Sequence, residues 1–318
     1  MMLRLGTRLL SPSGAGARLS ILIFHRVHDQ VDTLFPGEPD RAVFDRILTW
    51  LGRWYTVLPL DAAAQRLREG SLPAAAAAIT FDDGYADNAR NAMPILQRHG
   101  MSATFFVASD FLDGGRMWND SVVEAVRGST CERLDLRENG WGLHALDSLD
   151  ARRQAIGKLL GQIKYLAPAE RQCAVDRIVA AAGTRLPDDL MMSSDQLRSL
   201  RTGGMLVGAH TCSHPILASL DDDAARAEIL AGKHRLEYLL QERVGLFAYP
   251  NGKPGQDYRP EQVALVRGLD FDAAVSTVVG AAGRSSDLFQ LPRFTPWDRS
   301  AGRFGLRMLM NLRSPLPA

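Results

Sequence analysis

The sequence is poor in cysteine, in net charge and in long apolar runs. Its three cysteines, Cys131, Cys173 and Cys212, have no Cys-x-x-Cys spacing, and their odd number argues against a disulfide framework. They are compatible with a reducing compartment. Lys and Arg number 37 against 36 for Asp and Glu, so the net charge gives no reason to expect a nucleic acid as partner. The apolar run at 21–24 is far too short to cross a bilayer.

The N-terminus is basic but lacks an unbroken apolar stretch. Arg4 and Arg8 resemble the start of a leader, whereas 11–18 is rich in Gly and Ser, where a secretory signal needs a continuous apolar run. We therefore expect no signal peptide, no transmembrane segment and a cytoplasmic protein. Hydrophobic residues make up 46% and charged residues 23% of the chain, which is typical of a soluble globular protein. The 318 residues suffice for one large domain or two small ones.

Short apolar or β-branched runs alternate with helical patterns along most of the chain. Continuous apolar runs of this length are typical of strands in a parallel sheet that is covered by helices. Repeated β-α alternation predicts an α/β fold, either a barrel of the TIM type or a doubly wound sheet. The expected strands span residues 19–24, 77–81, 103–108, 205–209, 246–249 and 273–277.

Helical patterns lie between these runs. Residues 41–54 have apolar side chains at helical spacing, and 86–99 ends before Gly100, a natural helix stop. Asp221 is a suitable N-cap for a long helix that runs to Gln241. These helices are expected to cover the sheet.

The segment 112–202 departs from the alternation. It has no convincing strand, and it contains an amphipathic helical stripe. We expect a mostly helical insertion here, within a domain spanning 19–300 that is followed by a C-terminal tail at 301–318. The stripe is formed by Ile156, Leu159, Leu160 and Ile163.

Two adjacent carboxylates, Asp82 and Asp83, follow the expected strand 77–81 in the segment Thr-Phe-Asp-Asp-Gly. Barrel enzymes place their catalytic groups at the C-terminal ends of strands. Neighbouring side chains of a strand point to opposite faces, so both carboxylates can face one site only if the chain leaves the strand there. Gly84 permits such a turn. On its own, this segment is better explained as a polar turn after a strand.

A second polar segment, His-Thr-Cys-Ser-His, begins at His210 and ends at His214, again after an apolar run. Two histidines four residues apart share a helix face or converge in a turn, and both arrangements suit a metal. The zincin motif His-Glu-x-x-His has its general base between the histidines, whereas this segment offers no carboxylate. Asp82 or Asp83 would have to supply the base. Alone, the pair fits an ordinary polar turn about as well as a site, and Cys212 fits a small buried residue better than a ligand.

The ordered pair of segments resembles the polysaccharide deacetylase family (NodB homology), whose members show T-F-D-D-G followed later by H-[ST]-x-x-H. Both patterns match without a substitution. The resemblance to the family extends over about 20–300 apart from the insertion. The resemblance implies a distorted (β/α) barrel of about seven strands and a hydrolase that removes N-acetyl groups from sugars. It also implies Asp82 as catalytic base and a divalent metal, zinc by expectation although cobalt and nickel suit the ligands as well. The implied ligands are Asp83, His210 and His214.

The implied roles are chemically consistent. Two histidines and a carboxylate leave metal positions open for water and for the acetyl carbonyl. A bound metal acidifies the water and polarises the carbonyl, and Asp82 would take the proton of that water. The oxyanion that forms then needs a further hydrogen-bond donor.

The segment 247–252, Phe-Ala-Tyr-Pro-Asn-Gly, resembles the third motif of the family. There the backbone N–H before the glycine helps to hold the oxyanion, a role that falls on Asn251, with Tyr249 nearby. The arginine with which this motif usually begins is absent. Arg293, near a late strand, is the candidate partner that orients Asp82, and a surface salt bridge is an equally good explanation of it.

The family commonly uses a histidine near the C-terminus to protonate the departing amine, but no histidine follows His234. The segment 24–27, Phe-His-Arg-Val, resembles the Y-H-x-[IV] element of members with circularly permuted motifs, such as deacetylases of biofilm poly-N-acetylglucosamine. That resemblance implies His25 as general acid, with a core histidine as the alternative. Trp118 and Trp297 are candidates to stack on a sugar ring, although buried tryptophans are commoner.

Three other functions stay open. The same residues could hydrolyse a non-sugar amide, and a catalytically silent carbohydrate-binding homologue could keep the fold. The intact motif residues argue against silence. A glycosidase fits less well, because its two carboxylates flank the scissile bond roughly 5–9 Å apart and adjacent residues at one metal do not. The expected partner is an N-acetylated saccharide, and the sequence carries no prediction of oligomeric state.

Overall fold

The computed structural model describes residues 2–296 and 298–314. The chain divides into two compact units, which we call the barrel unit and the small unit. The barrel unit comprises Met1–Gln30, Gly37–Asp113 and Met192–Ala318, and the small unit comprises Val31–Pro36 and Gly114–Met191.

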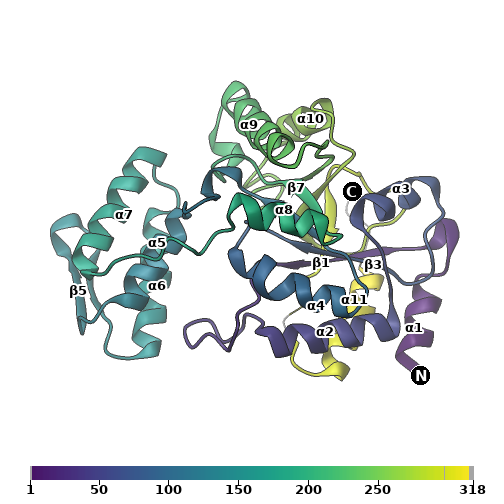
Figure 1. The fold of residues 1–318 in the computed structure, drawn as a ribbon, viewed down its shortest axis with the longest axis horizontal. Helices are drawn as coiled ribbons and strands as arrows, with labels where there is room; N and C mark the ends of the chain where they lie inside the picture. Colours follow the sequence, from purple (N-terminus) through teal and green to yellow (C-terminus); the bar gives the residue numbers. More distant parts are fainter. Residues whose placement is uncertain (1, 297, 315–318) are drawn as a thin grey trace. The chain divides into compact units, whose positions relative to one another are not determined.

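The barrel unit contains a parallel sheet that nearly closes on itself (Figure 1). The last strand returns to the first, because Ile23 N–H donates to the carbonyl of Phe294 at 3.0 Å and Phe294 N–H donates to that of Ile21 at 2.7 Å. The predicted distorted barrel of about seven strands is therefore confirmed. In spatial order the strands are β1 (Leu19–Phe24), β3 (Ala76–Phe81), β4 (Thr104–Val107), β7 (Leu206–Ala209), β8 (Leu246–Ala248), β9 (Ala273–Val279) and β10 (Leu291–Arg293), with β2 (Thr56–Val57) paired to β3.

Alternation along the strands creates two cores. Odd-numbered residues of β3, such as Ile79 and Phe81, pack outward, while Ala76 and Ala78 pack with residues of other strands inside the barrel. Because period-2 alternation continues to the strand end, Thr80 and then Asp82 point into the barrel mouth.

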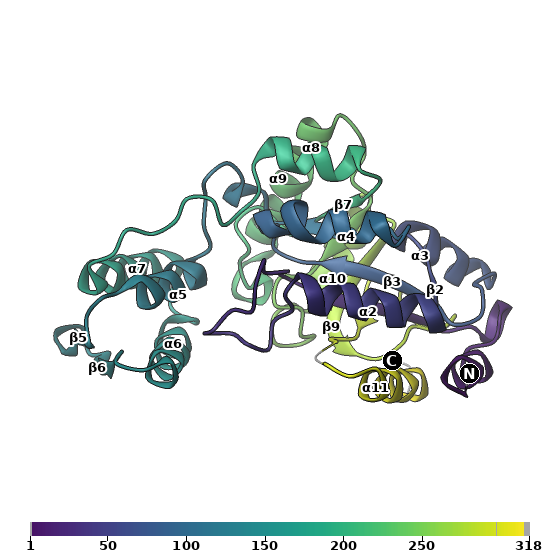
Figure 2. The same cartoon turned by 60° about the horizontal axis from the view of Figure 1, so that its bottom comes forward.

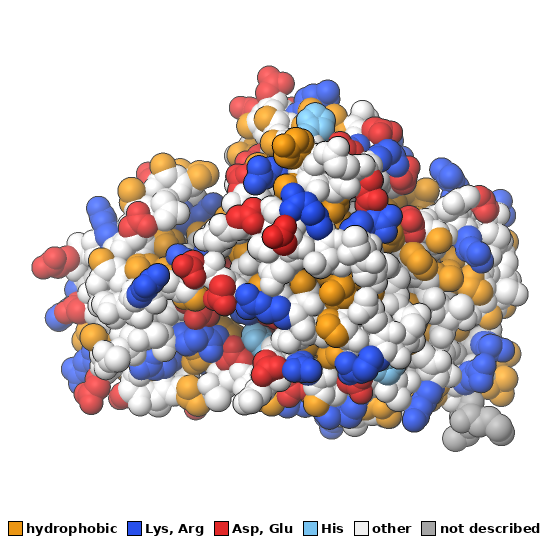
Figure 3. Space-filling view, in the orientation of Figure 1, with side chains coloured by type: hydrophobic (Ala, Val, Ile, Leu, Met, Phe, Trp, Pro, Cys, Tyr) orange, Lys and Arg blue, Asp and Glu red, His pale blue; other side chains and the backbone are white. Residues whose placement is uncertain are grey.

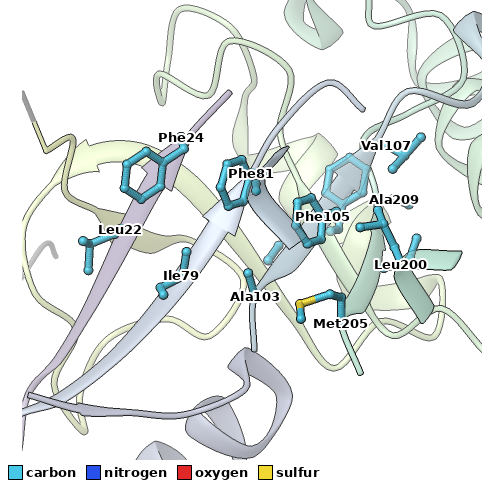
Figure 4. Close-up of a cluster of buried hydrophobic side chains, with 14 of the residues drawn as sticks. Leu22, Phe24, Ile79, Phe81, Ala103, Phe105, Val107, Leu200, Met205 and Ala209 are labelled. Atoms are coloured by element: carbon cyan, nitrogen blue, oxygen red, sulfur yellow. The ribbon is translucent and has the colours of Figure 1, made fainter. Parts of the chain in front are cut away.

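The outward core includes a row of aromatic rings at matching positions of neighbouring strands (Figure 4). Phe24 pairs in register with Phe81, and Phe81 pairs with Phe105. Their ring centroids lie 5.3 Å and 4.8 Å apart and the rings are stacked, an arrangement worth about 0.5–1.5 kcal/mol per pair beyond area burial. The row aligns the ends of β1 and β3, so the residues that follow these two strands, His25 and Asp82, begin at one level, while β4 continues two residues further to Val107.

Helices surround the sheet much as the patterns predict. The helix at 41–54 is confirmed, and the side chain of Asp221 accepts a hydrogen bond from Ala224 N–H as the predicted cap. The segment 86–99 is helical but not uniform, because 88–92 forms a π-helical turn before α4. The helices are α2 (Arg41–Trp54), α3 (Leu60–Glu69), α4 (Met93–Arg98), α8 (Ser194–Thr202), α9 (Asp222–Leu240) and α10 (Pro260–Gly268).

The N-terminal α1 (Met2–Leu10) and the C-terminal α11 (Ala301–Arg313) also belong to the barrel unit. Residues 301–313, assigned to a tail by the sequence analysis, thus form a helix instead. Phe304 and Met308 are buried in the main core, where Phe304 lies 5.7 Å from Trp50 between ring centroids. Helix α8, which the analysis placed in the insertion, also packs here through Leu197 and Leu200.

The small unit has its own core. It contains α5 (Trp118–Gly128), α6 (Leu149–Ile163), α7 (Pro168–Ala182) and an antiparallel hairpin of β5 (Arg133–Leu136) and β6 (Gly142–Ala145). The expectation that 112–202 holds no strand was wrong. Each strand has only four residues, of which one or two are buried, so its alternation is too short to stand out.

Within the described residues, no helix combines the length and the apolar character that a bilayer crossing needs. Cationic and anionic side chains are intermixed on the face shown in Figure 3, as the balanced composition leads one to expect.

Candidate metal and catalytic site

Asp83, His210 and His214 converge at the C-terminal ends of β3 and β7. One ligand atom of each lies within 4.8 Å of the others. The Asp83 Oδ1 atom is 3.4 Å from His210 Nε2 and 3.5 Å from His214 Nε2. These distances exceed the usual hydrogen-bond range. They match the edge of a zinc tetrahedron, because two ligands at 2.0–2.2 Å from the ion lie roughly 3.3–3.6 Å apart. The residues therefore fit one cation.

Electrostatics favour the metal-binding form of Asp83 and of His214, whereas the neighbouring carboxylates of Asp83 and Asp82 raise the pKa of His210, so a cation would displace a proton from that imidazole. Burial alone raises the pKa of Asp83, but the surrounding histidines, with His210 first, lower it below its usual range. Burial and the charge of His210 lower the pKa of His214 to about 4, so its Nε2 is unprotonated near neutral pH. A carboxylate and a neutral imidazole are the forms that ligate metals.

The backbone turns sharply after β3. Asp82 still follows the strand, since its N–H donates to the carbonyl of Phe24, but Asp83 has φ 77° and Gly84 has φ 95°. The chain leaves the strand one residue before the glycine that the sequence analysis singled out. A Cβ on Gly84 would lie 2.9 Å from Val107, so a larger residue would be strained twice over. The turn brings the two adjacent carboxylates to different partners, Asp82 to Arg293 and Asp83 to the two histidines.

The two histidines converge in a turn and share no helix. His210 Nδ1–H donates to the carbonyl of Ala248 at 2.7 Å, which leaves Nε2 to face Asp83. The N–H of His214, with φ 56°, donates to Thr211 Oγ1 at 3.1 Å. This local network presents both Nε2 atoms to the same space.

Glu228, on α9, holds this loop from outside and was missed by the sequence analysis. Its carboxylate accepts hydrogen bonds from the N–H groups of Cys212 and Ser213 at 3.2 Å and 2.9 Å. Cys212 is half-buried and outside the ligand cluster, with its thiol against Asp110 at 2.8 Å. Burial raises the pKa of the Cys212 thiol to about 12, so it stays protonated.

Asp82 and Arg293 form a buried bidentate ion pair. Each guanidinium Nη atom lies 2.7 Å from one carboxylate oxygen, and Arg293 and Asp82 are 1% and 3% exposed. Arg293 Nε also donates to the carbonyl of Ser276 at 2.8 Å. Such burial excludes a surface salt bridge. Burial by itself would raise the pKa of Asp82. The charge and hydrogen bonds of Arg293, together with the charges of His210 and His25, outweigh burial and lower this pKa, so Asp82 remains a carboxylate.

His25 is exposed at the end of β1 and is not a core histidine. Its charge reaches the site, where it lowers the pKa of Asp82 and of Asp83. It lines a depression of about 80 Å³ together with Glu38 and Thr295.

The π-helical turn after β3 fixes the loop that follows β1. Asn88 Nδ2 donates to the carbonyl of His25 at 2.8 Å, and the Val27 N–H donates to Asp87 Oδ1 at 3.1 Å. Asn91 Nδ2 donates to the carbonyl of Val27 at 2.8 Å. The sequence analysis missed these three polar residues, although their position just after the Asp-Asp-Gly turn is a usable signal.

The segment 247–252 contains core residues as well as residues of the loop that follows β8. Tyr249 is buried, stacks on Tyr258 and donates from its hydroxyl to the carbonyl of Phe289 at 3.0 Å. Its side chain thus belongs to the core, against the expected substrate contact. Asn251 has φ 58°, and its carbonyl accepts from Thr277 Oγ1 at 2.9 Å.

Of the two tryptophan candidates, only Trp118 lies within the described residues. Trp118 begins α5 in the small unit, where it packs against the core of that unit and the guanidinium of Arg171 lies 5.0 Å from its ring. One face of the ring is therefore covered. Trp297 lies outside the described residues.

The chain is similar to known proteins in both sequence and fold. The family model described as "Polysaccharide deacetylase" matches residues 69–267. YxkH of Bacillus subtilis (strain 168), which carries the name of a polysaccharide deacetylase, is 20% identical over 279 residues, covering 87% of this chain and 71% of that protein.

Solved structures share the fold. The Streptococcus pyogenes deacetylase PplD in complex with acetate has a TM-score of 0.61 at 18% identity, covering 94% of this chain and 99% of that one. IcaB from Ammonifex degensii has a TM-score of 0.59 at 18% identity, with 93% and 98% covered. At such identities the likeness shows the fold alone.

Proposed function

Because the chain belongs to the polysaccharide deacetylase family and is a hydrolase of that class, we propose that it hydrolyses N-acetyl groups of saccharides with a divalent cation. The family model covers 69–267 of 318 residues. The observation that carries the proposal is that a cluster of metal-ligating side chains and a separate buried carboxylate lie together at one barrel mouth. Asp83, His210 and His214 can hold a cation, and Asp82 stands next to them as a carboxylate whose oxygens are bound by Arg293.

The donor set suits zinc, and cobalt or nickel as well. A cation bound there would polarise the acetyl carbonyl and acidify a water. Two imidazoles and one carboxylate leave positions open for both. The divalent cation and its identity are part of the proposal.

Asp82 and Asp83 differ in role because their surroundings differ. Both oxygens of Asp82 are engaged by Arg293, which fixes the carboxylate and keeps it out of the ligand set. Asp82 accepts the proton of the attacking water. The water oxygen bonds to the acetyl carbon, the C–N bond breaks, and acetate and a free amine result.

Two further groups complete the reaction. His25 donates a proton to the departing amine nitrogen from the open side of the site. The backbone N–H of Asn251, in a left-handed turn, donates to the oxygen that becomes negative on the acetyl carbon. Both roles rest on position and on the family resemblance.

The test is an acetate-release screen over N-acetylated saccharides with and without a chelator. Release that stops with chelator and returns with zinc supports the proposal. Release only from non-sugar amides would assign the site to another amidase. Absence of release from any substrate, despite bound metal, would indicate a silent homologue. Cytoplasmic location stays a prediction, based on the lack of an unbroken apolar stretch near the basic N-terminus and on the few cysteines.

The His25→Ala variant is expected to keep its metal and lose about 100- to 10,000-fold in turnover of amide substrates. The loss should arise in the step that breaks the C–N bond, because the departing amine nitrogen then lacks its proton donor. An activated acetyl ester, whose leaving group needs no proton, should be much less affected. The measurement is the turnover of both substrates.

His99→Ala is the matched control. His99 follows the end of α4 and pairs with Asp45 of α2, so it belongs to neither the ligand cluster nor the Asp82–Arg293 pair. It should behave as wild type. Equal loss on ester and amide in the His25 variant, with metal retained, would make His25 a structural residue.

The Arg293→Met variant is expected to lose about 3–5 kcal/mol of stability at neutral pH, because the Asp82 carboxylate stays buried without its partner. In the wild type, the lowered pKa of Asp82 gives stability that is present above its unfolded-state pKa and is lost as the pH falls. In the variant, the charge that lowers this pKa is gone and burial raises it. The acidic limb of activity should therefore move to higher pH.

Urea unfolding at two pH values and a pH–rate profile measure these effects. The double variant Asp82→Asn, Arg293→Met removes the unpaired charge and should recover part of the stability. An unshifted acidic limb in Arg293→Met would show that Asp82 does not set that limb.

A further inference from the structure

Helices α1 and α11 lie side by side on the barrel unit (Figures 1 and 2). Glycines allow the close approach: a Cβ on Gly305 would lie 2.7 Å from Leu3, and one on Gly6 would lie 3.4 Å from Leu309. The hydroxyl of Thr7 donates to the carbonyl of Trp54 at 3.2 Å, which ties α1 to α2. The pair is thus an integral part of the barrel unit.

The outer sides of the two helices are apolar. Leu5 and Leu9, one turn apart on α1, are 61% and 72% exposed. Leu306 and Met310, one turn apart on α11, are 57% and 60% exposed. At 100° per residue, each row lies next to the residues that form the helix–helix contact, so the rows flank one seam.

This concentration is not general. Of the eleven large hydrophobic side chains exposed in the described part of the chain, five lie on these two helices, the fifth being Leu10. The others are dispersed over loops and other elements. Scattered exposed leucines need no explanation, but adjacent rows on two packed helices form a patch.

The charge of the two helices is one-sided. They contain five arginines and no aspartate or glutamate, although the whole chain is balanced at 37 basic against 36 acidic residues. Arg307 pairs with Asp298. Arg4 and Arg8 immediately precede Leu5 and Leu9, so a cationic row borders the apolar row on α1. The other arginines are Arg303 and Arg313.

We propose that the α1–α11 face docks on an anionic lipid surface. Apolar rows bordered by arginines are the pattern of a helix that lies in the membrane interface, where leucines enter the headgroup boundary and guanidinium groups meet lipid phosphates. A second copy of the chain fits less well, because it would bring two arginine-rich, acid-free faces together. The docking holds the barrel unit at a membrane surface.

The proposal is tested with the full chain and two kinds of vesicle, phosphatidylcholine alone and an equal mixture with phosphatidylglycerol. Co-sedimentation is expected with the mixture, to be weak with phosphatidylcholine, and to weaken as salt screens the arginines. The variant Leu5→Gln, Leu9→Gln, Leu306→Gln, Met310→Gln should bind the mixed vesicles at least tenfold more weakly. Its thermal unfolding and its metal content should match the wild type, because the four side chains are exposed.

Leu143→Gln, Leu149→Gln is the matched control, since both leucines are 46% exposed elsewhere. It should bind vesicles as the wild type does. The variant Arg4→Gln, Arg8→Gln should bind the mixed vesicles more weakly than the wild type. Its weak binding to phosphatidylcholine alone should be unchanged. Equal sedimentation of wild type and the fourfold variant would overturn the proposal. A wild-type dimer that the fourfold variant splits, with no vesicle binding by either, would also overturn it and assign the face to self-association.

Discussion

Replacement of Asp83, His210 or His214 by alanine is expected to abolish bound metal and acetate release together. The three ligand atoms lie within 4.8 Å of one another, and loss of one leaves two ligands for a cation that needs at least three from the protein. Metal content by mass spectrometry and turnover on one substrate measure both losses. The expected activity is at background, a larger loss than any acid–base variant should show.

Thermal unfolding gives a readout that does not depend on activity. A cation that binds only the folded chain stabilises it by about 2.7 kcal/mol at a free concentration of 100 times Kd. Added zinc should therefore raise the Tm of the wild type and leave that of the three variants unchanged.

Cys212→Ser is the matched control for the ligand variants. Cys212 lies between the two histidines in sequence, but its thiol contacts Asp110 and it is outside the cluster. The control should keep metal and activity. Full occupancy in any one alanine variant would remove that residue from the ligand set.

The sequence predicted the barrel and the level of the site, because these depend on local patterns. Buried apolar runs mark parallel strands, and the polar residues directly after them fall at the C-terminal mouth. Asp82 and His210 follow their strands in this way. The convergence of His210 and His214 in a turn was left open, and the left-handed φ of Thr211 and His214 settles it.

The Asp82–Arg293 ion pair could not be derived from local pattern. Its partners lie 211 residues apart, and Arg293 reaches Asp82 only because β10 closes against β1. Strand β10 has three residues, too few for a periodic signal. The family resemblance indicated only that an arginine is absent from the third motif and that Arg293 could replace it. Barrel closure places Arg293 in contact with Asp82.

The places of Tyr249 and of residues 301–313 depend on packing that the sequence pattern does not show. A tyrosine after a strand looks equally suited to a site and to a core, and only packing against Tyr258 and Phe289 decides for the core. Residues 301–313 carry an apolar face at Phe304 and Met308, one helical turn apart, and this face packs into the main core.

Asp82→Asn separates the base from the ligands. The expected result is full metal content with turnover lowered by about 100- to 10,000-fold, because a carboxamide cannot accept the proton of the attacking water. The amide also presents one N–H group toward Arg293, so part of the ion pair is lost and stability should fall by about 3–5 kcal/mol. Turnover is therefore measured well below the Tm, with circular dichroism to verify the fold.

Asp83→Asn is the informative comparison, since it makes the same change of group one residue later. If Asp83 is a ligand and Asp82 the base, Asp83→Asn should lose affinity for metal and regain turnover at high zinc, whereas Asp82→Asn should gain nothing from added zinc. The opposite pattern would exchange the two roles. Turnover of Asp82→Asn within a few-fold of the wild type would place the base elsewhere. The bidentate contact with Arg293 would then serve only to hold β3 against β10.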